Sequence, residues 1–225
     1  MKKTFAALAL ATALVPFSSA QADVVSYTAS KAMTTTNWSD LLSFGKFDSS
    51  LGTLTSIKFD LNGLVRGFGE AESLDAAPST VTLTLGSVLG LTRPDGSTLV
   101  VTNPVFSQQF QFTEYDGVRD SAGTSGGSTG TVEASGANSF VSTASSDFAL
   151  FSALGGGLLN LGMNAVGAST GVGAGNLATF FNTAASGTAT VTYEYTPFAE
   201  VPEPASMALI LGGLGLLGLS RRRVK

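Results

Sequence analysis

Apolar and polar residues alternate along much of the chain between its two ends. The alternation is clear in residues 57–62, 80–85 and 188–195, where every second residue is apolar. Successive side chains of a β-strand point to opposite faces, so this period of two predicts strands with one buried and one exposed face. The third series runs into Pro197, which cannot donate a ladder hydrogen bond, and this favours a last strand at a sheet edge.

Shorter apolar runs bounded by turn residues predict further strands. They are residues 24–29, 41–47, 106–112, 131–134 and 148–152. Turn sequences such as Arg93-Pro94-Asp95-Gly96 lie between them, where proline presets φ and glycine admits a positive φ. Many short strands without a long helical period predict an all-β domain over residues 23–196, an antiparallel β-sandwich of jelly-roll-like type.

Two glycine-rich segments interrupt this pattern. Residues 121–130 are nearly all Ser, Thr and Gly, so they lack the apolar area needed to order themselves and are predicted to form a mobile loop. Residues 154–175 are apolar but rich in glycine. They predict a strand pair with a tight loop, and a short helix is the alternative.

The N-terminal residues have the order of a signal peptide over residues 1–22. Lys2 and Lys3 form a basic head, an apolar stretch follows, and Ala20-Gln21-Ala22 is a small-x-small cleavage site. We therefore expect export, cleavage by signal peptidase after Ala22, and a mature chain that begins at Asp23. A buried N-terminal helix is the alternative.

The C-terminal residues show a second ordered set of features. Val201, Pro202, Glu203 and Pro204 end a linker at residues 197–204, and the prolines keep this segment extended. The fifteen uncharged residues 205–219 follow, and then Arg221, Arg222 and Arg223. A helix over these fifteen residues is about 22 Å long, against a hydrocarbon core of roughly 30 Å. Residues 205–225 thus predict a marginal transmembrane helix, with its arginines held on the cytoplasmic side.

This tail, residues 201–225, resembles the PEP-CTERM sorting signal. The resemblance implies recognition by an exosortase, a membrane enzyme that cuts near the Pro-Glu-Pro motif. It also implies a transient inner-membrane intermediate, followed by the cell envelope, outer surface or extracellular matrix of a Gram-negative bacterium. The alternative is a plain transmembrane anchor that is never cut.

Part of the central region also resembles a known family. Trp38, residues 47–54 and residues 191–195 are similar to the choice-of-anchor bacterial domains, type E in particular. The resemblance implies a domain that works at the cell surface, without naming a biochemical role. The same residues have a structural interpretation, in which Phe47 and Leu51 fill a core while Asp48, Ser49 and Gly52 form a turn.

Composition excludes several kinds of chemistry. The chain contains no Cys and no His, so disulfides, thiolate sites, cysteine nucleophiles and histidine bases are all absent. Half of the twelve basic residues lie in the terminal segments, whereas all sixteen acidic residues lie between them. Loss of both ends would leave an acidic domain that repels nucleic acid.

A few polar groups still resemble sites. Ser125 lies in a G-x-S-x-G sequence at residues 123–127, but this pattern needs a histidine base and arises by chance in Ser/Gly-rich loops. Glu70 and Glu72 would share a strand face, as a glycosidase carboxylate pair requires, but the glycine-rich setting of residues 67–69 favours a solvated sheet edge. Glu114, Asp116 and Asp120 are oxygen ligands of the kind Ca²⁺ prefers, but their spacing is not that of an EF-hand. We therefore expect no catalytic, cofactor or metal residues.

The sequence thus predicts an exported surface or biofilm-matrix protein without catalytic activity or cofactors. One alternative is a carbohydrate-binding module for exopolysaccharide, with Trp38, Tyr115 and Tyr195 as stacking platforms. The other is a glycosidase that uses Glu70 and Glu72.

Overall fold

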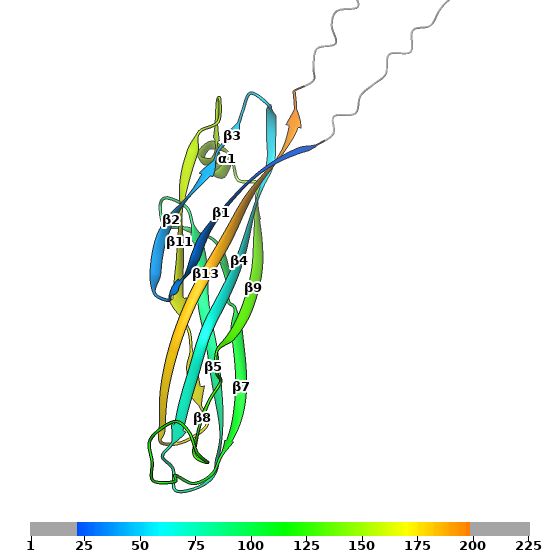
Figure 1. Cartoon of the computed structure of the whole chain (residues 1–225). Coiled ribbons are helices and arrows are strands. Elements are labelled where there is room, and N and C mark those ends of the chain that lie inside the picture. Colours follow the sequence, from blue (N-terminus) through cyan, green and yellow to red (C-terminus); the bar gives the residue numbers. More distant parts are fainter. Residues whose placement is uncertain (1–21, 199–225) are drawn as a thin grey trace, which may run out of the picture. The chain divides into compact units, whose positions relative to one another are not determined.

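Thirteen strands and one short helix account for most of residues 22–198, the part of the chain that the computed structural model describes (Figure 1). Eleven of the strands form two antiparallel sheets packed face to face, and the predicted all-β sandwich is confirmed. The predicted signal peptide up to residue 21 and the predicted sorting helix lie outside the described residues. Among residues 22–198, no helix is long and apolar enough to cross a membrane.

The first sheet is built on two very long neighbouring strands, β4 and β13. They pair antiparallel almost throughout, from Gly52 with Pro197 to Ser73 with Leu177. Strand β1 extends the sheet beside β13, while β8 and β9 lie end to end along the other side of β4. The bounds are β1 Asp23–Thr35, β4 Gly52–Ser73, β8 Gly126–Ser128, β9 Val132–Ser142 and β13 Leu177–Pro197.

The second sheet is centred on β5. Strands β6 and β7 pair with one edge of β5, and β11 and β12 pair with the other edge, with β2 beyond β11. A two-stranded parallel pair, β3 with β10, stands apart from both sheets. The bounds are β2 Trp38–Gly45, β3 Phe47–Asp48, β5 Ser79–Thr92, β6 Thr98–Thr102, β7 Val105–Phe112, β10 Ser152–Ala153, β11 Leu158–Gly167 and β12 Thr170–Val172.

The alternating apolar residues point between the sheets, as their period predicts. Ile57, Phe59 and Leu61 are fully buried and meet Leu89 and Leu91 of β5 in the main core. A smaller apolar cluster around Val81 and Leu83 continues the core along the sandwich. The structural interpretation, which put Phe47 and Leu51 in the core, is wrong for Leu51. Phe47 is buried, but Leu51 is 45% exposed.

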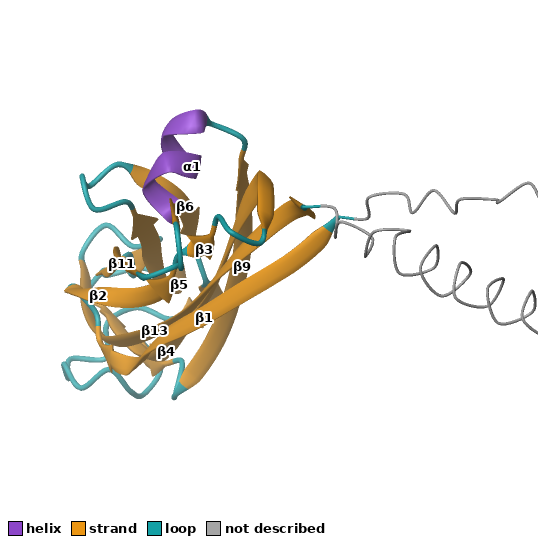
Figure 2. Cartoon of the chain, turned by 90° about the horizontal axis from the view of Figure 1, so that it is seen from above, coloured by secondary structure: helices purple, strands orange, loops and turns teal. Residues whose placement is uncertain are grey.

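One predicted strand is wrong. Residues 148–152 were expected to be extended, but Ser145–Phe151 forms helix α1, which lies at the margin of the domain rather than in a layer of its own (Figure 2). Phe148 and Phe151 are three residues apart, so one turn of helix directs both to the core, and Phe151 packs edge-on against Phe59 with ring centroids 5.1 Å apart. Asp147 in the first turn favours the helix through its dipole.

Two other expectations need correction. Strand β13 is not a sheet edge, because β1 and β4 pair with its two sides and Pro197 merely ends it. Residues 154–175 do form two strands, but β11 and β12 do not pair with each other. They follow one another along β5, whose length accommodates both.

The long strands give the sandwich two distinct ends. At the end that we call proximal, Asp23 of β1 pairs with Tyr195 of β13, so the described chain begins and finishes there side by side. At the distal end, β4 turns into β5 near Asp75. The 22 residues of β4 separate the two ends by about 70 Å.

Candidate functional site

The loop between β7 and β8, residues 113–125, covers β4 at the distal end; we call it the distal loop. Backbone hydrogen bonds hold it at three points: Thr113 N donates to Thr124 O (2.9 Å), Tyr115 N to Asp75 O (2.9 Å) and Ser73 N to Ser125 O (2.8 Å). The predicted mobile loop at 121–130 overlaps this segment. Residues 126–128 are instead strand β8, because β4 offers them an unpaired edge.

Two candidate residues from separate patterns meet beneath this loop. Ser125 Oγ donates a hydrogen bond to Glu72 Oε1 at 2.5 Å, and Asp116 N donates to Ser125 Oγ at 3.2 Å. Ser125 and Glu72 are both fully buried. Glu72 Oε2 has no hydrogen-bond partner within the described residues. The sequence shows each residue but not their meeting, because 53 residues of chain separate them.

This buried pair differs from the expected solvated edge. Glu70 and Glu72 do share the outer face of β4, but Glu70 is partly exposed while Glu72 is sealed under the distal loop. A glycosidase needs two carboxyl groups on either side of a bound sugar. A nucleophilic serine likewise needs access to its substrate. The geometry therefore indicates that the Ser125–Glu72 hydrogen bond holds the distal loop against the sheet.

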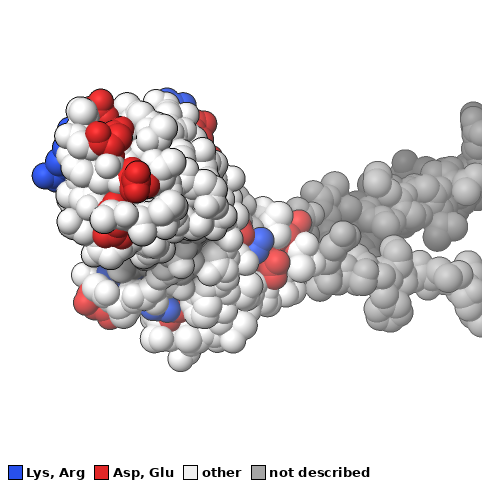
Figure 3. All heavy atoms as spheres, turned by 90° about the horizontal axis from the view of Figure 1, so that it is seen from below, with Lys and Arg blue, Asp and Glu red and all other residues white. Residues whose placement is uncertain are grey.

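The three acidic residues considered for calcium lie on the distal loop and are exposed. Asp116 Oδ1 accepts from Val118 N and Asp120 Oδ1 from Ala122 N, both at 2.9 Å, so each carboxylate holds its own turn. Within residues 22–198, no three acidic side chains gather closely enough to hold a metal ion. Viewed from the distal end, the acidic residues form separate patches (Figure 3).

The three aromatic candidates for sugar stacking do not form one platform. Tyr195 is buried against Phe47, with ring centroids 5.0 Å apart, near the proximal end. Trp38 packs against the core, and Lys31 Nζ lies 5.9 Å from its ring centroid. Tyr115 belongs to the distal loop, roughly the full length of β4 away from Tyr195.

A shallow polar depression lies on the outer face of the first sheet, midway along β4. Its volume is about 590 Å³, and its lining carries amine, carboxylate, amide and hydroxyl groups. It is lined by Lys58, Asp60, Asn62, Ala137, Asn138, Ser139 and Thr190. These side chains alternate with the buried ones of β4, so the period that builds the core also builds this surface.

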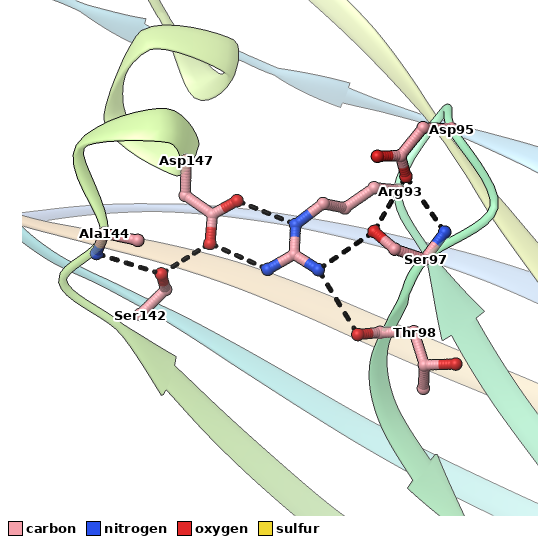
Figure 4. A network of polar contacts seen from close by, with 7 residues as sticks. All are labelled: Arg93, Asp95, Ser97, Thr98, Ser142, Ala144 and Asp147. Carbon is pink, nitrogen blue, oxygen red and sulfur yellow. Dashed lines mark hydrogen bonds and ion pairs between the residues drawn. The ribbon is translucent and has the colours of Figure 1, made fainter.

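A largely buried polar network ties α1 to the turn between β5 and β6 (Figure 4). Arg93 donates from Nε and Nη2 to the two oxygens of Asp147, at 2.7 and 2.8 Å, and Ser142 Oγ bonds Asp147 Oδ2 at 2.5 Å. These hydrogen bonds hold the pKa of Asp147 below its usual range, and those from Arg93 have the largest effect. Sequence reasoning missed this clamp, since 54 residues separate its two charges.

The predicted processing residues are only partly described. Ala22 is exposed, and Asp23 is the first residue of β1. The other residues of the cleavage site and the sorting motif fall outside the described part. They are Ala20, Val201, Pro202, Glu203, Pro204, Arg221, Arg222 and Arg223.

Comparison with known families identifies the tail. Residues 200–224 match the family model of the PEP-CTERM protein-sorting motif. The chain carries this motif, and the motif implies secretion toward the cell envelope with an exosortase as the processing partner. No curated protein matches the chain. The resemblance of the central region to choice-of-anchor type E domains stays a prediction.

Comparison with solved structures adds two viral matches. One is the structure of the infectious bursal disease virus Gx strain, at 11% identity, with 88% of this chain and 49% of that chain covered and a TM-score of 0.16. The other is the VP2 subviral particle of the same virus, at 12% identity, 90% and 49% coverage and a TM-score of 0.17. The chain thus spans about half the length of these structures.

Proposed function

Starting from the sorting motif at residues 200–224, we propose that this chain is an exosortase-processed protein of the cell surface or biofilm matrix whose β-sandwich acts without catalysis. The motif supports export and sorting. The role of the domain is inferred from how the sandwich is built. Signal peptidase and exosortase are the processing partners of this proposal.

The path of the chain through the sandwich is the observation that carries this proposal. The described chain starts and finishes at the proximal end, where Asp23 pairs with Tyr195. The sorting motif begins two residues after Phe198, and two residues span at most about 7 Å. A sandwich held at this end presents the distal loop about 70 Å away. Such a rigid spacer suits a structural or adhesive surface protein.

The geometry of the candidate residues supports the absence of catalysis in this proposal. Ser125 and Glu72 hydrogen-bond each other beneath the distal loop, where no substrate reaches them. A Glu70→Gln, Glu72→Gln double variant should leave polysaccharide turnover by the protein at the level of the unsubstituted chain. A loss of turnover would instead establish a glycosidase.

Two epitope tags test the sorting proposal, one on the exposed turn at residues 95–96 and one after Lys225. We expect the upstream tag to reach the envelope or medium and to separate from the downstream tag. A Pro202→Ala, Glu203→Ala, Pro204→Ala variant should stay intact in the inner membrane, and so should the unsubstituted chain in a host without exosortase. Mass spectrometry that finds Lys225 on the secreted protein would contradict the proposal.

A second candidate function is binding of exopolysaccharide at the polar depression. Its amide, carboxylate and hydroxyl side chains offer the hydrogen-bonding groups that sugar hydroxyls need. Asn62→Ala and Asp60→Asn should then weaken binding on a glycan array, whereas Asp95→Asn, on an exposed turn elsewhere, should not. Equal binding by all three variants would remove this candidate.

A further inference from the structure

The most exposed large apolar side chains of the described residues lie at the proximal end of the sandwich. Within residues 22–198 the two most exposed are Leu154 and Leu158, at 83% and 75%. Val24, Leu51 and Phe198, at 63%, 45% and 59%, belong to the same end. Single exposed apolar residues are ordinary, but a group at one end of a domain marks an interaction surface.

The backbone brings the two leucines outward together. They flank three glycines in residues 154–158, a segment that we call the leucine loop. Gly155, Gly156 and Gly157 all have positive φ, of 77°, 77° and 132°, which side chains with a Cβ rarely adopt. The loop therefore depends on its glycines, and it directs both leucines away from the core.

Hydrogen bonds join the leucine loop to its apolar neighbours. Asp48 Oδ1 accepts from Gly155 N (2.9 Å) and from Ser50 N (2.9 Å). Leu51 N donates to Asp48 O (3.1 Å), and Phe198 N donates to Leu51 O (3.2 Å). The Asp48 carboxylate is thus engaged by two backbone N–H groups. These bonds join the backbone of the leucine loop, through Asp48, to that of Leu51 and Phe198.

The sequence beyond Phe198 indicates what this surface meets. The sorting motif begins at residue 200, and its uncharged run begins at Ala205. Seven residues from Phe198 to Ala205 span at most about 25 Å, so a bilayer that holds the run lies within that distance of the proximal end. Lys46, whose amide donates to Gly157 O at 2.9 Å, is a basic residue beside the loop. Its ammonium suits lipid phosphate, while its stem tolerates apolar surroundings.

We propose that the leucine loop, with Leu51 and Phe198, enters the outer surface of the membrane while the chain is held by its sorting tail. The inference rests on the proposed function, because it needs the tail in the bilayer. Apolar anchors of peripheral proteins sink about 5–10 Å into the boundary between headgroups and acyl chains. Each leucine side chain removed from water there raises the partition constant by on the order of tenfold. The contact would hold the sandwich at a set orientation before cleavage and would be lost on release.

Single introduced cysteines test this contact, because the chain has none of its own. Leu154→Cys and Leu158→Cys are labelled with an environment-sensitive fluorophore in the full chain, reconstituted in phospholipid nanodiscs. Val118→Cys is the matched control, since Val118 is also apolar and exposed (56%) but lies on the distal loop. We expect emission at positions 154 and 158 to shift to shorter wavelength and to be lost when the lipids carry a shallow spin-label quencher. Emission at position 118 should do neither.

Three other outcomes would overturn the proposal. Labels at 154 and 158 that match position 118, in chains that resist alkaline carbonate extraction, would refute the leucine contact and leave the sorting proposal intact. Carbonate extraction of the chain would refute the anchoring and the contact together. A shift to shorter wavelength without lipid quenching, which rises with the number of chains per disc, would assign the surface to a second copy.

Discussion

The clamp between Arg93 and Asp147 allows a sharp prediction for stability. We consider Asp147→Asn, which keeps the size of the side chain but removes its charge. The side chain of Asp147 is 4% exposed and that of Arg93 is 19% exposed, so both charges rely on each other rather than on water. The substitution turns one acceptor oxygen into a donor that faces the guanidinium.

The expected loss follows from these contacts. Breaking a buried ion pair on one side costs about 3–5 kcal/mol. Arg93 retains contacts with Ser97 Oγ (3.2 Å) and Thr98 O (3.3 Å), as well as some exposure, which lowers the figure. We therefore expect a loss of about 2–3 kcal/mol in the free energy of unfolding. For a domain of this size that lowers Tm by roughly 4–12 °C.

The loss should depend on pH in one direction. The pKa of Asp147 is lowered in the folded protein, so the stability from the pair is complete above the ordinary carboxyl pKa of about 3.9. This contribution falls as pH drops through the lower folded value. The difference between the unsubstituted chain and Asp147→Asn should stay constant from pH 7 to about 5 and shrink below about 4.

Denaturant unfolding followed by tryptophan fluorescence, repeated across pH, measures this difference. Asp60→Asn is the matched control, because Asp60 pairs with Lys58 at 2.9 Å on the surface, where the two side chains are 31% and 44% exposed. Such pairs contribute less than about 1 kcal/mol. If Asp147→Asn costs no more than Asp60→Asn at neutral pH, the clamp does not stabilise the domain as argued.

Three further substitutions test other parts of the structure. Tyr193→Phe removes the hydroxyl that donates to Gly45 O at 2.8 Å and should cost about 1 kcal/mol in thermal unfolding; no change would mean that water replaces the bond. Gly67→Ala places a Cβ 1.9 Å from Asn182 O, and we expect it to destabilise the domain by at least about 2 kcal/mol. Unchanged expression and Tm would contradict this prediction. Ser125→Ala strips the Glu72 carboxylate of its one hydrogen bond within the described residues, so hydrogen exchange should rise in the distal loop and not in β11.

The regular parts of the fold follow from local sequence. Period-two alternation in residues 57–62 and 188–195 identifies strands and their buried faces, because burial repeats with the pleat. It does not identify neighbours, so β13 was expected at an edge although β1 covers its free side. The short apolar run at residues 148–152 was expected to be a strand, but two phenylalanines three residues apart direct a helix to the core there.

The polar contacts are harder to predict, because each depends on residues distant in sequence. Glu72 was expected on a solvated edge, and nothing near it in the chain indicates that Ser125 and the distal loop cover it. Arg93 lies in a predicted turn, but Asp147 lies in a segment expected to be a strand, so their clamp was not foreseen. Leu51 was assigned to a core that Phe47 alone enters, since apolarity does not distinguish a buried residue from an exposed one.

The pairing of β13 on both sides has a mechanical consequence. When tension acts between a C-terminal tether and the distal loop, the force runs lengthwise along β13, whose ladders to β1 and β4 are loaded in shear. Many hydrogen bonds then bear the force at the same time, instead of breaking one after another. A domain tethered in this way resists the drag of flowing liquid, when it acts along the strands, better than a pull that opens the ladders from one end.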